Sequence, residues 1–289
     1  MTAHPELYAA ILARCSTRRY DRQPLDRATT DQVREIISSP QPLLGENQFT
    51  ALLRDAPPGT DLVRELGGYG RIVNPSHYLV PYVLGEQHQL EDAGYRVEQI
   101  AVHLTALGIG SCFIGALQRE SAVRALYELP DTARLGALLV LGRPSAGLAG
   151  RATNRLLRLV AGADRKLPAH EIFFEGSFDA PKVPPAFIAP LIEAASSAPS
   201  AVNAQPWRFL WLDGRLHLFV TRRNRRYGYG LQEEYRFHDA GAAMANISLA
   251  LEALEMRGYW RMAAGEEPGA PSPPSDLEWI ATLTLGHAA

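Results

Sequence analysis

Two tripeptides, Asp92-Ala93-Gly94 and Asp239-Ala240-Gly241, each open a stretch in which apolar residues recur at helical spacing. The second begins about half a chain length after the first. Two further pairs of segments match in the same order, Ser38-Ser39-Pro40 to Phe49 with Ser196-Ser197-Ala198-Pro199 to Trp207, and Leu139–Gly142 with Leu283–Gly286. One matching tripeptide is common by chance, but three collinear matches are not. The sequence therefore predicts two related halves.

The predicted halves comprise residues 1–142 and 185–289, joined by a connector of residues 143–184 that is rich in arginine and leads into several prolines. We expect helices over Leu7–Arg14, Asp31–Ile37, Asp92–Leu107, Phe187–Ser196 and Asp239–Met256. We expect strands over Leu135–Leu141, Arg208–Leu212, Leu216–Thr221 and Trp279–Leu285. This pattern predicts an α+β fold with helices around central sheets.

Short signals set the ends of these elements. Thr30 and Asp92 are expected to cap the N-termini of two helices, and Gly108 is expected to end the second of them. Asp213-Gly214 lies between two apolar runs and predicts a tight hairpin.

Composition excludes several classes of protein. The 289 residues carry a net charge of −2, so no global charge points to nucleic acid or to an anionic membrane. Two cysteines cannot form a disulfide framework, and the eight histidines show no metal-ligand spacing. No apolar run approaches the roughly 20 residues of a membrane span, and the N-terminus lacks the apolar core of a signal peptide. We expect a soluble, cytoplasmic protein without a bound metal.

Three segments carry candidate chemistry. Arg14–Tyr20 combines three arginines with a serine, and arginine suits phosphate recognition. Pro199–Trp207 is a loop whose hydroxyl and amide groups can bind a planar heteroaromatic ligand. Gly108–Gly115 allows close approach of backbone N–H groups. Taken singly, the first also fits a solvated helix end, the second an ordinary helix-to-strand turn, and the third a helix C-cap followed by a strand.

Together these segments resemble the nitroreductase family of flavoproteins. The family has an Arg-x-Ser-x-Arg-x-aromatic segment, a Pro-Ser-x-x-Asn-x-Gln-Pro-Trp loop and a Gly-Leu-Gly-Ser-like turn, which match Arg14–Tyr20, Pro199–Trp207 and Gly108–Gly115. The loop stands in the second half, later than the family's usual order. Family members are homodimers with two FMN sites, each built from both subunits. The late position of the loop therefore indicates a fused pseudo-dimer, as in a subgroup of putative nitroreductases.

The fused arrangement predicts one FMN per chain. The site formed by Arg14–Tyr20 and Pro199–Trp207 has both parts intact. The other site would combine the connector near His170–Phe174 with Pro40–Phe49, and neither part keeps the motif residues. A chain that contains its own dimer interface is expected to be a monomer.

By resemblance, Arg14 and Ser16 would hold the phosphate and ribityl chain, while Arg18 would lie near the pyrimidine edge and favour the reduced ring. The full set of expected cofactor-binding residues is Arg14, Ser16, Arg18, Arg71, Ile114, Gly115, Arg151, Arg155, Pro199, Ser200, Asn203 and Gln205. Gln205 could instead brace the loop, and the choice between Arg151 and Arg155 for the phosphate stays open. Four aromatic residues, Tyr227, Tyr229, Tyr235 and Phe237, are candidates for a substrate pocket, with core packing as the alternative.

The expected activity is that of an FMN-dependent NAD(P)H oxidoreductase, which reduces a nitroaromatic, quinone or enone by hydride transfer through flavin N5. The flavin carries this chemistry, and no catalytic side chain is expected. One alternative is a flavin-binding protein for storage or sensing. Another is a nucleic-acid binder that uses Arg222–Arg226, although the net negative charge favours a solvated loop as the explanation of that basic run.

Overall fold

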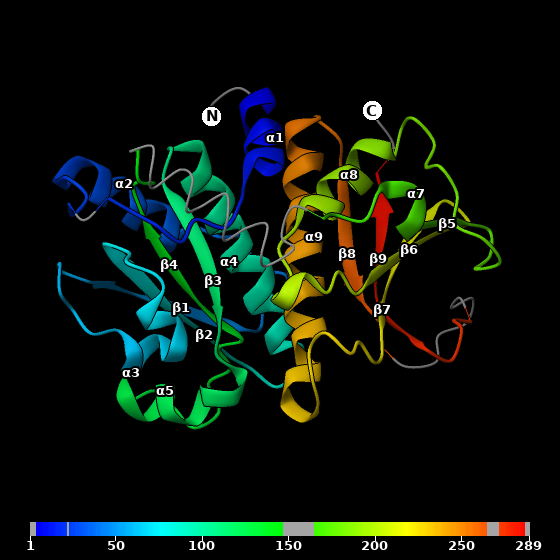
Figure 1. The fold of residues 1–289 in the computed structure, drawn as a ribbon. Coiled ribbons are helices and arrows are strands. Elements are labelled where there is room, and N and C mark those ends of the chain that lie inside the picture. Colours follow the sequence, from blue (N-terminus) through cyan, green and yellow to red (C-terminus); the bar gives the residue numbers. More distant parts are fainter. Residues whose placement is uncertain (1–3, 22, 147–164, 265–271, 287–289) are drawn as a thin grey trace.

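The computed structural model describes residues 4–21, 23–146, 165–264 and 272–286. Two β-sheets stand on either side of a central layer of helices (Figure 1). The first sheet has the order β1-β2-β4-β3, with β1 at Gln48–Asp55, β2 at His77–Leu84, β3 at Gly110–Gly115 and β4 at Ala137–Gly142. The second has the order β5-β6-β7-β9-β8, with β5 at Phe173–Glu175, β6 at Trp207–Leu212, β7 at Arg215–Thr221, β8 at Gly258–Met262 and β9 at Leu277–Leu285.

The two sheets repeat one topology. The order β1-β2-β4-β3 in the first half recurs as β6-β7-β9-β8 in the second, and the pairs within each set are antiparallel. The exception is β5, which follows the first half in sequence but pairs in parallel with β6. The chain thus leaves the first half and adds an edge strand to the sheet of the second. The shared topology confirms the two related halves that the sequence repeats predict.

Helices α4 (Gln89–Ala106) and α9 (Tyr235–Ala253) lie side by side at the centre of the molecule (Figure 1). A Cβ added to Gly94 would lie 2.0 Å from the carbonyl oxygen of His238, and one added to Gly241 would lie 2.0 Å from that of Glu91. Each contacted residue stands three positions before the glycine of its own helix. The contact is therefore reciprocal, as expected for two copies of one helix packed about a pseudo-twofold axis.

The remaining helices cover this central pair. α1 (His4–Ala13) and α8 (Ala189–Ser197) pack on α9 beside the second sheet, and α2 (Arg27–Ser38) packs on α4 beside the first. Short helices α3 (Val63–Leu66), α5 (Glu120–Leu126) and α7 (Ala169–Ile172), with the 3₁₀ turns η1 (Gly67–Arg71), η2 (Leu117–Arg119), η3 (Ala201–Asn203) and η4 (Gly230–Glu234), complete the described elements. The largest hydrophobic core joins α1, α8 and α9 to the second sheet.

Several expected element ends are confirmed and two are wrong. Gly108, with φ of 72°, follows α4, and Asp213-Gly214, with φ of 49° and 73°, joins β6 to β7 as a hairpin. Thr30 is not a cap, because α2 begins one turn earlier and Asp26 accepts the Thr29 N–H at 2.9 Å. Asp92 lies inside the first turn of α4, where it is fully buried.

Candidate functional site

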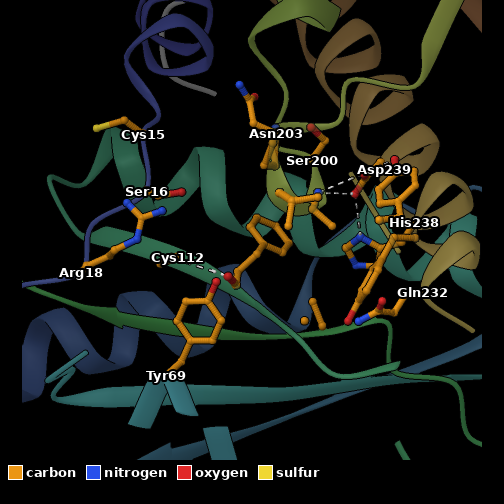
Figure 2. A pocket seen from close by; sticks show the side chains of 18 of the residues that line it. Cys15, Ser16, Arg18, Tyr69, Cys112, Ser200, Asn203, Gln232, His238 and Asp239 are labelled. Atoms are coloured by element: carbon orange, nitrogen blue, oxygen red, sulfur yellow. Dashed lines mark hydrogen bonds and ion pairs between the residues drawn. The ribbon is translucent and has the colours of Figure 1, made fainter. Parts of the chain in front are cut away.

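A cavity of about 480 Å³ lies where the two halves meet, within the roughly 300–1,000 Å³ that is usual for small-molecule sites. Its walls come from the N-terminal segment after α1, from β3, from the loop between α8 and β6, and from the start of α9 (Figure 2). The lining includes the following predicted residues: Arg14, Ser16, Arg18, Gly115, Pro199, Ser200, Asn203, Tyr227 and Tyr235. The N-terminal arginine segment and the later Pro-Ser loop therefore share one cavity.

The N-terminal segment is held against β3 by backbone pairing. Ser16 forms a bridge with Ser111, and the Thr17 N–H donates to the Ser111 carbonyl at 2.8 Å. Gly110 makes this approach possible, because a Cβ there would lie 2.6 Å from the Thr17 Oγ1. The pairing fixes Ser16 and Arg18 at the cavity (Figure 2).

The Pro-Ser loop has a strained backbone that is tied down on several sides. Val202, Asn203 and Gln205 have φ of 49°, 53° and 48°, in the left-handed region that few non-glycine residues adopt. The Ala201 N–H donates to the Asp239 carboxylate at 3.0 and 3.1 Å. Such a conformation persists only when its surroundings fix it, which is typical of ligand sites.

Gln205 braces the Pro-Ser loop, which was the alternative to a cofactor-binding role. Its Oε1 accepts the Leu167 N–H at 2.7 Å, and its Nε2 donates to the Arg165 carbonyl at 3.0 Å. Gln205 is buried and does not line the cavity. Asn203 Nδ2 also donates to the Arg165 carbonyl, although Asn203 itself borders the cavity.

Four ionisable side chains lie at one wall of the cavity or directly behind it: Arg14, Lys166 and Asp239 line the cavity, and Glu98 lies behind Arg14. Arg14 Nε lies 3.1 Å from Glu98 Oε1, with side-chain exposures of 4% and 0%. Burial raises the pKa of Glu98 to about 7, against the opposing effect of Arg14. Burial lowers the pKa of Lys166 to about 7, and Arg14 adds to that effect. Burial also raises the pKa of Asp239 to about 7.

Lys166 is a cavity residue that sequence reasoning missed. It stands in the connector, in which the sequence predicts Arg151 or Arg155 for the phosphate; these two arginines lie outside the described residues. Its Nζ donates to the Ala198 carbonyl just before the Pro-Ser loop. The available signal was the Arg165-Lys166 pair, which is followed by Leu167 and Pro168 at the end of the arginine-rich connector. The connector carries several cations, and their spacing does not distinguish the one whose side chain reaches the cavity.

Aromatic side chains form another part of the cavity lining, which we call its aromatic end. Tyr227 donates to Asp239 at 2.7 Å, and Tyr235 accepts the Leu117 N–H at 3.2 Å. Gly115 leaves room for Tyr235, since a Cβ there would lie 2.3 Å from the tyrosine oxygen. The residues that sequence reasoning missed in this part of the lining are Tyr69, Phe113, Gln118, Gln232 and His238. Burial lowers the pKa of His238 to about 4, which makes its ring neutral at pH 7.

Four predicted site residues lie elsewhere in the structure. Tyr229 is 90% exposed, and Phe237 packs partly on the main core with the Arg236 guanidinium over its ring. Ile114 is buried in the core of the first half and does not line the cavity. Arg71 is exposed at the end of η1 and does not line the cavity.

In the first half, the loop that corresponds to the Pro-Ser loop is bonded by the side chain of Arg96. Asp92, the counterpart of Asp239, accepts the Leu43 N–H at 2.8 Å, as Asp239 accepts that of Ala201. Arg96 then pairs with Asp92 at 3.1 Å and donates to the Asn47 carbonyl at 3.1 Å. The position that corresponds to Arg96 in α9 is Ala243. Arg96 therefore hydrogen-bonds the first-half loop, and the corresponding residue of the second half is an alanine that cannot make such a contact.

Two arginines of the basic run Arg222–Arg226 donate hydrogen bonds to backbone carbonyls of other segments. Arg222 donates to the Leu277 carbonyl at 3.0 Å, and Arg226 donates to the Asn203 carbonyl at 2.7 Å.

Within the described ranges, no cluster of His, Cys, Asp or Glu side chains is arranged to hold a metal ion. Among the helices of the described residues, none is long and apolar enough to cross a membrane.

The fold is shared with a solved structure that covers nearly the whole chain, and partial similarity to others is weaker. A putative nitroreductase from Thermotoga maritima has 18% sequence identity, covers 99% of this chain and 96% of its own, and aligns with a TM-score of 0.59. Nitroreductase A from Vibrio parahaemolyticus has 18% identity over 48% of this chain and 68% of its own, with a TM-score of 0.41. A nitroreductase with bound FMN from Bacteroides fragilis has 22% identity over 49% of this chain and 90% of its own, with a TM-score of 0.39.

The protein thus has the nitroreductase-like α+β fold, with both halves in a single chain. The sequence profile of the family described as "Putative TM nitroreductase" matches residues 6–253. The chain belongs to this family, and its enzyme class is that of an oxidoreductase. No curated protein matches the sequence.

Proposed function

We propose that the cavity binds one FMN and that the protein is an FMN-dependent oxidoreductase, which passes hydride from NAD(P)H to an electron-poor acceptor. One observation supports this most strongly. Arg14, Arg18 and Lys166 line the same cavity as Ser200 and Asn203, which come from the other half of the chain. Figure 2 shows Arg18, Ser200 and Asn203 around it. Cations with adjacent neutral donors suit a ligand that combines a phosphate with a polar ring.

The donor set fits FMN on chemical grounds. The Arg14 Nη1 is buried and has no hydrogen-bond partner within the described part of the chain. A buried donor of this kind costs free energy unless an acceptor reaches it, and a phosphate oxygen is a strong acceptor. Arg18 would place positive charge where added electrons accumulate, which favours reduction of the cofactor. Bound FMN would supply the redox chemistry, taking hydride at N5 and giving it to the acceptor.

The acceptor is proposed to lie at the aromatic end of the cavity. Tyr69, Phe113 and Tyr235 offer ring surfaces, and the Gln118 and Gln232 amides offer hydrogen bonds. Flat acceptors with polar oxygens, such as nitroaromatics, quinones or enones, match such a wall. A neutral His238 adds no charge that would select an anion.

The contacts of Arg96 support a single FMN per chain. Its side chain bonds the loop that would form the second site, whereas the corresponding residue of α9 is Ala243. The same reasoning favours a monomer, because the interface that homodimers form between subunits lies inside this chain.

The test is the absorbance spectrum of the purified protein loaded with FMN, before and after anaerobic addition of NADH or NADPH. Bound flavin that is bleached by either nicotinamide, and restored by a quinone or nitroaromatic, supports the proposal. Failure to take up FMN refutes it. Flavin that binds but is reduced by neither nicotinamide would favour the storage or sensing role instead.

A matched pair of variants tests the binding site. A charge-assisted hydrogen bond contributes about 1.5–3 kcal/mol, so Arg18→Gln is expected to raise the FMN Kd at least about tenfold. Arg19→Gln removes the same charge from the neighbouring residue, which does not line the cavity. It is expected to change the Kd little. Equal losses in both variants would mean that general charge, not the site, binds the cofactor.

A further inference from the structure

Glu98 is a buried acid whose charged neighbours are mainly cations. It stands in the middle of α4 and is completely buried, facing the α9 interface. Arg14 is its ion-pair partner at 3.1 Å, Lys166 lies close enough to act on its charge, and Asn246 of α9 lies beside its carboxyl group. Neither carboxyl oxygen accepts a well-aligned hydrogen bond from the described residues. The carboxylate therefore depends on the Arg14 charge for its stability.

Arg14 in turn is shared between Glu98 and the cavity. Its Nε faces the carboxyl group, its guanidinium belongs to the cavity lining, and its Nη1 is an unused donor among the described residues. An anion that enters the cavity beside Arg14 competes with Glu98 for the same cation. Two anions on one buried guanidinium are less stable than one, because like charges repel strongly where water is excluded.

We propose that Glu98 is a positioning residue and an exchangeable counter-ion: it holds Arg14 in the cavity wall, and it takes up a proton when the cofactor phosphate replaces it. This inference rests on the proposed function, since it assumes that the phosphate reaches Arg14. The proton comes from solvent and ends on a Glu98 carboxyl oxygen, and no other bond changes. The pKa of about 7 that burial gives Glu98 means that the proton can be added near neutral pH.

Other titratable groups face the same place and must be separated from Glu98. Lys166 also lines the wall, and a nearby phosphate favours its protonated form, so it contributes uptake of the same sign. Asp239 faces Lys166 but is held by the Tyr227 hydroxyl and the Ala201 N–H. Lys166→Arg keeps a permanent positive charge and therefore removes the lysine contribution alone.

The experiment measures proton uptake when FMN binds to the full-length apoprotein. Titration calorimetry in two buffers of different ionisation enthalpy gives the number of protons, and flavin fluorescence gives the Kd from pH 6.5 to 8.5. The wild type is expected to take up protons, and its FMN Kd is expected to rise above pH 7 by up to about tenfold per pH unit for each proton. Riboflavin lacks the phosphate, so its binding is expected to take up none.

The variants locate the proton. Glu98→Gln keeps the size of the side chain and is expected to take up about one proton fewer, with tighter FMN binding than the wild type at pH 8. Simple structural damage would weaken binding instead. Lys166→Arg is expected to keep the uptake that Glu98 provides.

The outcomes are distinguishable. Uptake by Glu98→Gln that equals the wild-type value would overturn the inference, as would wild-type FMN binding without uptake. If Glu98→Gln does not fold, the comparison of FMN with riboflavin is made on Lys166→Arg, which lacks the lysine contribution. Equal uptake with the two flavins would refute a phosphate-driven exchange at Glu98, and greater uptake with FMN supports it. A wild type that binds neither flavin at any pH would instead refute the proposed function.

Discussion

Gly241→Ala should weaken the whole protein, because the added methyl group meets backbone at the centre of the molecule. The new Cβ would lie 2.0 Å from the Glu91 carbonyl oxygen and 2.8 Å from the Tyr95 nitrogen, whereas real Cβ contacts essentially never fall below 3.0 Å. Both contacted atoms belong to the backbone of α4, which cannot rotate away as a side chain can. Helices α4 and α9 must therefore separate by about 1 Å, which is the difference between the 3.0 Å limit and the 2.0 Å contact with the Glu91 carbonyl oxygen.

The magnitude follows from two opposing effects. Overpacking of a core typically costs 1–3 kcal/mol, and a rigid backbone contact belongs at the upper end of that range. Alanine gains up to about 1 kcal/mol over glycine in a helix interior. We expect a net loss of about 2 kcal/mol in the free energy of unfolding. Urea unfolding followed by circular dichroism measures it as a lower midpoint.

Gly68→Ala is the matched control for this prediction. A Cβ on Gly68 meets nothing within 4 Å, and its backbone is outside the left-handed region. This variant should stay within about 0.5 kcal/mol of the wild type, as surface substitutions usually do. If Gly241→Ala were as stable as Gly68→Ala, the close crossing of α4 and α9 would be wrong.

Three more predictions concern the turn, the buried acid and the closed site. Gly214→Ala places a side chain at φ of 73° in the β6–β7 hairpin and should cost about 1–2 kcal/mol in urea unfolding; no loss would exclude that turn. Glu98 has a raised pKa, so its contribution to stability is present below its ordinary pKa of 4.5 and is lost as pH rises through about 7. The melting temperature of Glu98→Gln should therefore improve relative to the wild type between pH 4.5 and 8 in thermal scans, and an unchanged difference would contradict this. Arg96→Ala leaves buried Asp92 without its partner and should lower stability by about 3–5 kcal/mol. Its flavin content should still not exceed one per chain by absorbance, because Pro40–Phe49 and His170–Phe174 also lack the motif residues of the intact site. Two flavins per chain would show that Arg96 alone keeps the first half from forming a site.

Much of the fold can be predicted from the sequence because the signals are local. Helical spacing places α4 and α9, and Asp213-Gly214 places a hairpin, since both depend on neighbours along the chain. Helix starts are harder: Thr30 and Asp92 look like caps, but Asp26 and burial decide otherwise. The strands β1 and β2 were not predicted, and β5 joins a sheet on the far side of the central helices from the half that precedes it.

The sequence alone therefore determined the duplication, the α+β class and the two motifs that meet in the cavity, because repeats and motif residues are readable in one dimension. Only the tertiary structure decided that Lys166 turns into that cavity, that Glu98 pairs with Arg14, and that Arg96 fills the other loop. These outcomes depend on burial and on distances between residues far apart in the chain. Both are set when α4 packs against α9, and no local pattern records them.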